Sequence, residues 1–276
     1  MIALPRDGQN GLRLVLLGLA ALIFILLGWR GPDRGPISRP AALAKIIPDI
    51  SLSLGGDARP AVEISLTQAG EYAPVLDRMR RDFGTDYERV IEEFAERASS
   101  EGRIESVDYY LAEMIRGLRQ RRGILAARAS PAPLSRIFEI QAQMLTALSK
   151  TNPKLCVDFL YGNVSPDFYA FAASNRRLVA DMALAAMNAV ADGRRQKVER
   201  RAPSNIDFDL LEKELTSRGL SRPEIDALLD GRAPERPPGD VRMCEAGRKY
   251  IDALQSIPEG SRARIQALAV ELMARS

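Results

Sequence analysis

The chain has 276 residues, of which 46% are apolar and 27% charged, a balance that excludes disorder along its whole length. Its 39 basic and 36 acidic side chains give a net charge of only +3, so the concentrated positive field of a nucleic-acid-binding protein is excluded too. Histidine is absent, which removes the side chain used most often for acid-base catalysis near neutral pH and the commonest metal ligand.

An apolar segment lies near the N-terminus, at residues 12–29. Its one charge, Arg13, is close enough to its end to reach the lipid headgroups. As a helix the segment would span about 27 Å, against a hydrocarbon core of about 30 Å. Trp29 and Arg30 have the character of residues at a membrane interface. We therefore predict a short tail at 1–11 and an uncleaved transmembrane anchor at 12–29, with the lipid bilayer as its partner.

Two alternatives for this segment are a cleaved signal peptide and a buried core helix. A signal peptide would have the same basic start, but residues 28–33 lack the small-x-small pattern of a cleavage site. Cation counting favours a cytoplasmic main domain, because more cations follow the segment than precede it. A very short N-terminal tail usually stays in the cytoplasm, however, so we expect a single-pass inner-membrane protein whose main domain is periplasmic.

The anchor is followed by two segments that differ from the rest of the chain. Residues 30–45 include three prolines and two glycines between Gly31 and Pro40, which predicts an extended tether. Within 46–69, apolar and polar residues alternate at 50–54 and again at 62–66, which predicts a small β-hairpin. An isolated hairpin is marginally stable, so it would pack on its own domain or, as the less favoured option, pair with another chain.

Residues 70–276 have apolar side chains at intervals of three and four, which predicts a helical domain. A capping box of Thr85 and Glu88 is predicted to start the first clear helix. The predicted helices include 87–98, 107–118, 137–148, 152–162, 165–192, 241–255 and 261–275. Because no internal repeat is present, we predict a mainly α fold: an irregular multi-helix bundle with a small β-hairpin, preceded by one transmembrane helix.

The two cysteines, Cys156 and Cys244, fall in separate predicted helices. An exported domain would join them, and closing a loop of that length contributes about 4 kcal/mol in the chain-entropy model. The alternative is a pair of unpaired buried thiols. Neither cysteine belongs to a C-x-x-C motif or has a histidine base, so a catalytic thiol is not predicted.

A cluster of cations surrounds a single acid, Glu199. Its members are Arg194, Arg195, Lys197, Arg200 and Arg201. Such a cluster could contact anionic headgroups or a polyanion. The simpler interpretation is a solvated helix end, since cations also suit the negative pole of the preceding helix.

The sequence predicts no metal, cofactor or catalytic site. The carboxylates of Asp207, Asp209, Glu212 and Glu214 lie along a predicted helix beside Lys213, whereas hard cations need several oxygens converging from a constrained loop. Phosphate-loop, dinucleotide-binding and serine-nucleophile motifs are all missing from the sequence.

The segment 220–231 resembles the short N-terminal segment of flagellar switch proteins that docks on a response regulator. The matching residues are Leu220, Ser221, Glu224, Ile225, Asp226, Ala227, Leu228, Leu229 and Gly231. The resemblance implies a domain that faces the cytoplasm. The same residues also form a capped amphipathic helix, with Ser221 and Glu224 as the capping box and the apolar residues facing a core.

These features favour a membrane-anchored helical domain with a binding, scaffolding or assembly role at the cell envelope, where an envelope protein would be its partner. One alternative is a carboxylate-based hydrolase of an envelope polymer. Another is a cytoplasm-facing regulatory protein that docks through the helix at 220–231. A hydrolase would have a polar cleft with converging acids of shifted pKa, and a binding module an apolar groove or patch.

Overall fold

The computed structural model describes residues 57–162, 165–229 and 238–275. The predicted anchor, the tether and the first half of the predicted hairpin lie outside these residues. The described part contains twelve α-helices and two short 3-10 helices, and no strand. It is therefore mainly α, as predicted.

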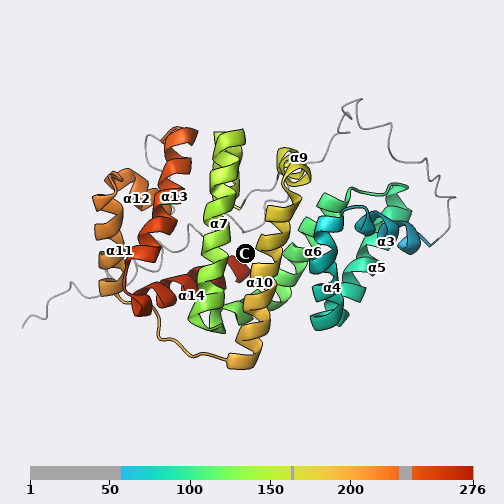
Figure 1. Ribbon diagram of the computed structural model, residues 1–276, viewed down its shortest axis with the longest axis horizontal. Helices are drawn as coiled ribbons and strands as arrows, with labels where there is room; N and C mark the ends of the chain where they lie inside the picture. The colour runs from blue at the N-terminus through green and yellow to red at the C-terminus, as the bar shows by residue number, and fades with distance from the viewer. Residues whose placement is uncertain (1–56, 163–164, 230–237, 276) are drawn as a thin grey trace, which may run out of the picture.

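The first group of helices forms one end of the molecule (Figure 1). It comprises α3 (Arg59–Thr67), η1 (Gly70–Tyr72), α4 (Ala73–Asp82), α5 (Gly84–Glu101) and α6 (Val107–Arg122). The middle of the molecule holds η2 (Gly123–Arg128), α7 (Pro131–Thr151), α8 (Pro153–Leu160), α9 (Pro166–Ser174) and α10 (Arg176–Gln196).

The C-terminal helices form the other end and return to the middle (Figure 1). They are α11 (Asn205–Ser217), α12 (Arg222–Leu229), α13 (Asp240–Ser256) and α14 (Glu259–Arg275). The short helix η2 lies at the centre of the fold, because α6, α10 and α14 all pack against it. Among the described residues, no helix combines the length and the apolar character needed to cross a bilayer.

The predicted β-hairpin is wrong where the structure describes it, because residues 59–67 form helix α3. Pro60 lies in its first turn, where its missing N–H is not needed. Val62 and Leu66 are four residues apart and buried, whereas Ile64 is 55% exposed. The alternating pattern at 62–66 therefore belongs to a helix with one buried face. The helical domain begins near residue 59, before the predicted boundary at 70.

Helix α5 confirms the predicted apolar stripe but not the predicted cap. Its buried residues include Tyr87, Val90 and Phe94. The helix begins at Gly84 after Phe83, which provides no side-chain cap, so the predicted capping box of Thr85 and Glu88 is wrong. Glu88 instead forms an ion pair with Arg59 of α3 at 2.5 Å.

The predicted helix at 165–192 is two helices, α9 and α10, that meet at Asn175. The side-chain amide of Asn175 donates a hydrogen bond to the carbonyl oxygen of Phe171 at 2.9 Å. Asparagine competes with helical hydrogen bonding in this way, which explains why the helix ends there.

Candidate functional site

Four carboxylates are buried near the starts of helices α5, α6, α11 and α12, and each binds arginine from a distant part of the chain. Asp86 accepts hydrogen bonds from Arg121 at 2.8 Å and Arg122 at 3.0 Å. The other pairs are Asp108 with Arg176, Asp207 with Arg264, and Glu224 with Arg242. The acids suit the positive poles of their helices, and the arginines balance their buried charge.

Three of these pairs lower the pKa of their carboxyl group: those of Asp86, Asp207 and Glu224. Burial raises the pKa of Asp86, but the hydrogen bonds from Arg122 and Arg121 outweigh it and the pKa is lowered. Hydrogen bonding to Arg264 lowers the pKa of Asp207 strongly. Among the described residues, every carboxyl group with a shifted pKa shifts in this direction: Asp86, Asp192, Asp207, Glu224 and Glu245. A hydrolase needs the opposite shift in its general acid.

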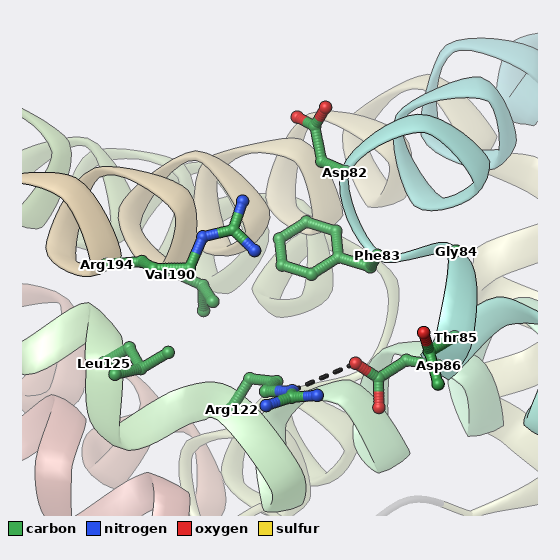
Figure 2. A pocket seen from close by; sticks show the side chains of 9 residues that line it. All are labelled: Asp82, Phe83, Gly84, Thr85, Asp86, Arg122, Leu125, Val190 and Arg194. Carbon is green, nitrogen blue, oxygen red and sulfur yellow. Dashed lines mark hydrogen bonds and ion pairs between the residues drawn. The ribbon is translucent and has the colours of Figure 1, made fainter.

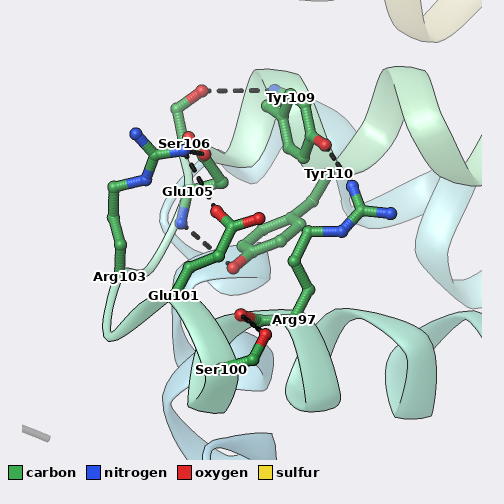
Figure 3. Close-up of polar contacts among 8 residues, drawn as sticks. All are labelled: Arg97, Ser100, Glu101, Arg103, Glu105, Ser106, Tyr109 and Tyr110. Atoms are coloured by element: carbon green, nitrogen blue, oxygen red, sulfur yellow. Dashed lines mark hydrogen bonds and ion pairs between the residues drawn. The ribbon is translucent and has the colours of Figure 1, made fainter. Parts of the chain in front are cut away.

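A polar groove of about 480 Å³ runs between α5 and α6. Four glutamates and four arginines from these helices and their connecting loop line it, together with Tyr109 and Gln120. Figure 3 shows the end nearest the loop, where Arg97 of α5 donates a hydrogen bond to the hydroxyl of Tyr109 on α6. The equal numbers of acidic and basic groups give the wall no net charge.

Several charges of this groove are paired with one another. Arg103 binds Glu105 and also Glu101, the latter at 3.3 Å. Arg116 binds Glu113 on the same helix. The groove therefore offers many hydrogen-bonding groups without strongly attracting either an anion or a cation. It is polar, unlike the apolar groove or patch predicted for a binding module.

A smaller pocket of about 140 Å³ lies between the start of α5, η2 and α10. Figure 2 shows Arg122 and Arg194 on its lining, beside the apolar side chains of Phe83, Leu125 and Val190. The guanidinium carbon of Arg194 lies 5.9 Å from the centre of the Phe83 ring, within range of a cation–π contact.

The members of the cationic cluster predicted at 194–201 differ in burial. Arg200 is partly buried and donates to the carbonyl oxygens of Ala127 at 3.1 Å and Ala129 at 2.5 Å, so it stabilises the fold. Burial lowers its pKa. The other four members, Arg194, Arg195, Lys197 and Arg201, are exposed. Arg195 pairs with Asp192 at 3.3 Å.

The two cysteines lie in α8 and α13 and are joined by a disulfide, with their sulfur atoms 1.92 Å and their Cα atoms 5.7 Å apart. The predicted proximity of Cys156 and Cys244 is confirmed. The predicted cap of α8 is confirmed too, because the side chain of Asn152 accepts hydrogen bonds from the backbone N–H groups of Lys154 and Leu155. Both cysteines are buried.

The remaining predicted features are explained by packing. Asp207 is buried against Arg264, and within the described ranges no three potential ligands are grouped to hold a metal. In α12, Glu224 accepts from the N–H and hydroxyl of Ser221, as the capped-helix interpretation predicts. Ile225 and Leu228 are buried. Docking through these apolar residues would therefore require α12 to leave its own domain.

Sequence analysis did not predict the groove between α5 and α6. Its signal was present as charges four residues apart on one face of α5, at Glu93, Arg97 and Glu101. The positions on α6 that complete the groove could not be assigned without knowing how the two helices pack.

Comparison with known proteins identifies no relative: no protein-family model matches the chain, and no curated protein or solved structure is detectably similar. The proposed function therefore rests on the residues of this chain.

Proposed function

We propose that the protein is a membrane-anchored binding module of the cell envelope whose helical domain is exported. The observation that carries this proposal is the buried disulfide between Cys156 and Cys244. Disulfides persist in oxidising compartments such as the periplasm and are rare in the cytoplasm. A domain with a buried disulfide therefore fits the periplasmic side of the membrane.

The apolar segment at 12–29 supplies the anchor in this proposal. An anchor raises the effective concentration of a weak binding surface near the membrane, so an interaction need not be tight to be useful. The tether at 30–45 would let the domain reach a partner at some distance from the bilayer.

The groove between α5 and α6 is the proposed binding site for the partner. Glu101, Glu105 and Glu113 are paired with arginines of the same groove, which favours binding over hydrolysis. The regulator alternative is less favoured, because Leu228 and Ile225 pack within the domain. The partner is proposed to be an envelope protein with a polar surface, since the groove presents hydrogen-bonding groups of both charges and has no net charge.

Cell fractionation tests the anchor and the export. We expect the full chain to stay in the membrane pellet after alkaline carbonate extraction. A protease added to spheroplasts should degrade the domain, while the same protease added to intact cells should leave it whole. Release by carbonate would contradict the anchor, and protection in spheroplasts would contradict the export.

Photo-crosslinking in living cells tests the groove. A photoreactive amino acid at Glu93, inside the groove, should give a discrete higher-mass product. The matched control is Glu96, which is exposed on the same helix and is not part of the groove lining. Equal products from both positions, or none from Glu93, would contradict a partner in the groove.

A further inference from the structure

An exposed isoleucine lies among cations near the centre of the fold. Ile124, in η2, is 46% exposed. Arg122, the last residue of α6, and Arg128, the last residue of η2, are exposed as well. The exposed cations Arg194, Arg195, Lys197 and Arg201 follow in a second segment, at the end of α10 and beyond it.

Backbone contacts hold the two segments side by side. The N–H of Val198 donates to the carbonyl oxygen of Arg128 at 2.9 Å. Arg200 donates to the carbonyl oxygens of Ala127 and Ala129. Arg122 and Arg194 line the same small pocket from the two segments (Figure 2). We call the surface formed by Ile124 and by Arg122, Arg128, Arg194, Arg195, Lys197 and Arg201 the basic face.

The basic face keeps a positive excess after its ion pairs are considered. Arg122 is balanced by Asp86, and Arg195 by Asp192. In the part of the chain that the structure describes, Arg128, Lys197 and Arg201 form no ion pair. The nearby acid Glu199 offsets one of these charges.

We propose that the basic face docks on anionic lipid headgroups, with the side chain of Ile124 entering the bilayer interface. The cations at the end of α10 lie beside η2, where Ile124 adds an exposed apolar side chain between Arg122 and Arg128 in the sequence. Cations around an apolar residue are the combination that binds an anionic membrane surface. The proposal rests on the membrane anchor proposed above, which keeps the domain close to the bilayer.

Tryptophan fluorescence of the full chain tests this docking. Trp29 is the one tryptophan, so Trp29→Phe combined with Ile124→Trp leaves a single reporter on the basic face. The protein would be reconstituted into vesicles of brominated phosphatidylcholine with or without phosphatidylglycerol. The matched reporter is Trp29→Phe with Val241→Trp, because Val241 is 69% exposed and lies at the start of α13, a helix that carries no member of the basic face.

We expect bromine quenching of the Ile124→Trp reporter in anionic vesicles, little in neutral vesicles, and little for Val241→Trp in either. Removing three charges through Arg194→Gln, Lys197→Gln and Arg201→Gln should lower the docking equilibrium constant by about 100-fold. The charge-matched control replaces the exposed cations Arg177, Lys213 and Arg248 by Gln and should leave the quenching unchanged.

Absence of quenching in anionic vesicles, equal quenching in neutral ones, or equal quenching of the Val241→Trp reporter would overturn the proposal. A response to soluble polyphosphate without one to vesicles would overturn it too, and would identify the ligand as a soluble polyanion. Flotation of the vesicles distinguishes the failure of the two proposals. Protein that does not float with neutral vesicles would contradict the membrane anchor. Protein that floats but is not quenched in anionic vesicles would contradict only the docking of the basic face.

Discussion

Gly193 of α10 packs directly on the backbone of Leu125 in η2: a Cβ added at Gly193 would lie 1.8 Å from the carbonyl oxygen of Leu125. Backbone atoms cannot move aside as a flexible side chain can. We therefore expect Gly193→Ala to lower the free energy of unfolding by about 3 kcal/mol or more, because α10 must move away from η2. Urea unfolding of the full chain in detergent, followed by circular dichroism, measures this loss.

The control for this change is Gly84→Ala in the first turn of α5, where an added Cβ meets nothing within 4 Å. Alanine favours a helix more than glycine does, so this variant should be neutral or slightly more stable. If both variants lost stability equally, the close packing of α10 on η2 would be wrong.

The Asp207–Arg264 pair makes stability depend on acid pH. The pKa of Asp207 is lowered in the folded state, so its contribution is present above the unfolded pKa of about 4 and is lost as the pH falls toward the folded value. Arg264→Gln leaves a buried carboxylate unpaired and should cost about 3 kcal/mol at neutral pH. The variant should also lose less stability than the parent between about pH 5 and pH 2.

An exposed arginine provides the comparison for that experiment. Arg136 and Glu139 form an ion pair with both side chains about half exposed. Arg136→Gln should therefore change stability by less than about 1 kcal/mol and leave the acid dependence as it was. If both variants changed the loss of stability at acid pH equally, Asp207 would not be the group that controls this loss.

Removing the disulfide should lower the stability of the domain, which should remain folded at room temperature. Cys156 and Cys244 are 88 residues apart in sequence, so the chain-entropy model predicts a loss of about 4 to 5 kcal/mol. The double variant Cys156→Ala and Cys244→Ala should melt at a lower temperature than the parent and be insensitive to reductant. A parent protein whose melting temperature does not change with reductant would contradict a structural disulfide.

Leu228 distinguishes packing from docking in α12. It is buried within its own domain, so Leu228→Ala should cost about 2 to 5 kcal/mol of stability. If the helix instead served as a free docking segment, the substitution would leave the urea midpoint unchanged. Asp226→Ala, on the same helix but only half-buried, should have a much smaller effect.

The helices were predictable where one apolar stripe decides the local structure. Tyr87, Val90 and Phe94 repeat at intervals of three and four and are all buried as predicted. The segment 62–66 was ambiguous because it satisfies both periods: Val62 and Leu66 fit a helix, while Ile64 completes an alternation. Only the packing of α3 against α5 and α6 decides between them.

The polar interior could not be predicted from the sequence. Asp108 lies on the buried side of α6 because Arg176, 68 positions later, reaches it with two hydrogen bonds. Nothing in the neighbourhood of either residue indicates the other. The basic face was predictable only in part for the same reason. Ile124 and Arg128 come from η2 and Arg122 from the end of α6, whereas the other cations come from the end of α10 and the residues after it.

Thiol alkylation in intact cells, with and without reductant, tests the central claim of an exported, disulfide-linked domain most directly. After denaturation without reductant, Cys156 and Cys244 should both resist the alkylating reagent, and both should be labelled once reductant is added, as mass spectrometry of the protein would show. Free labelling of both thiols in denaturant without reductant would contradict the disulfide and favour a domain that faces the cytoplasm.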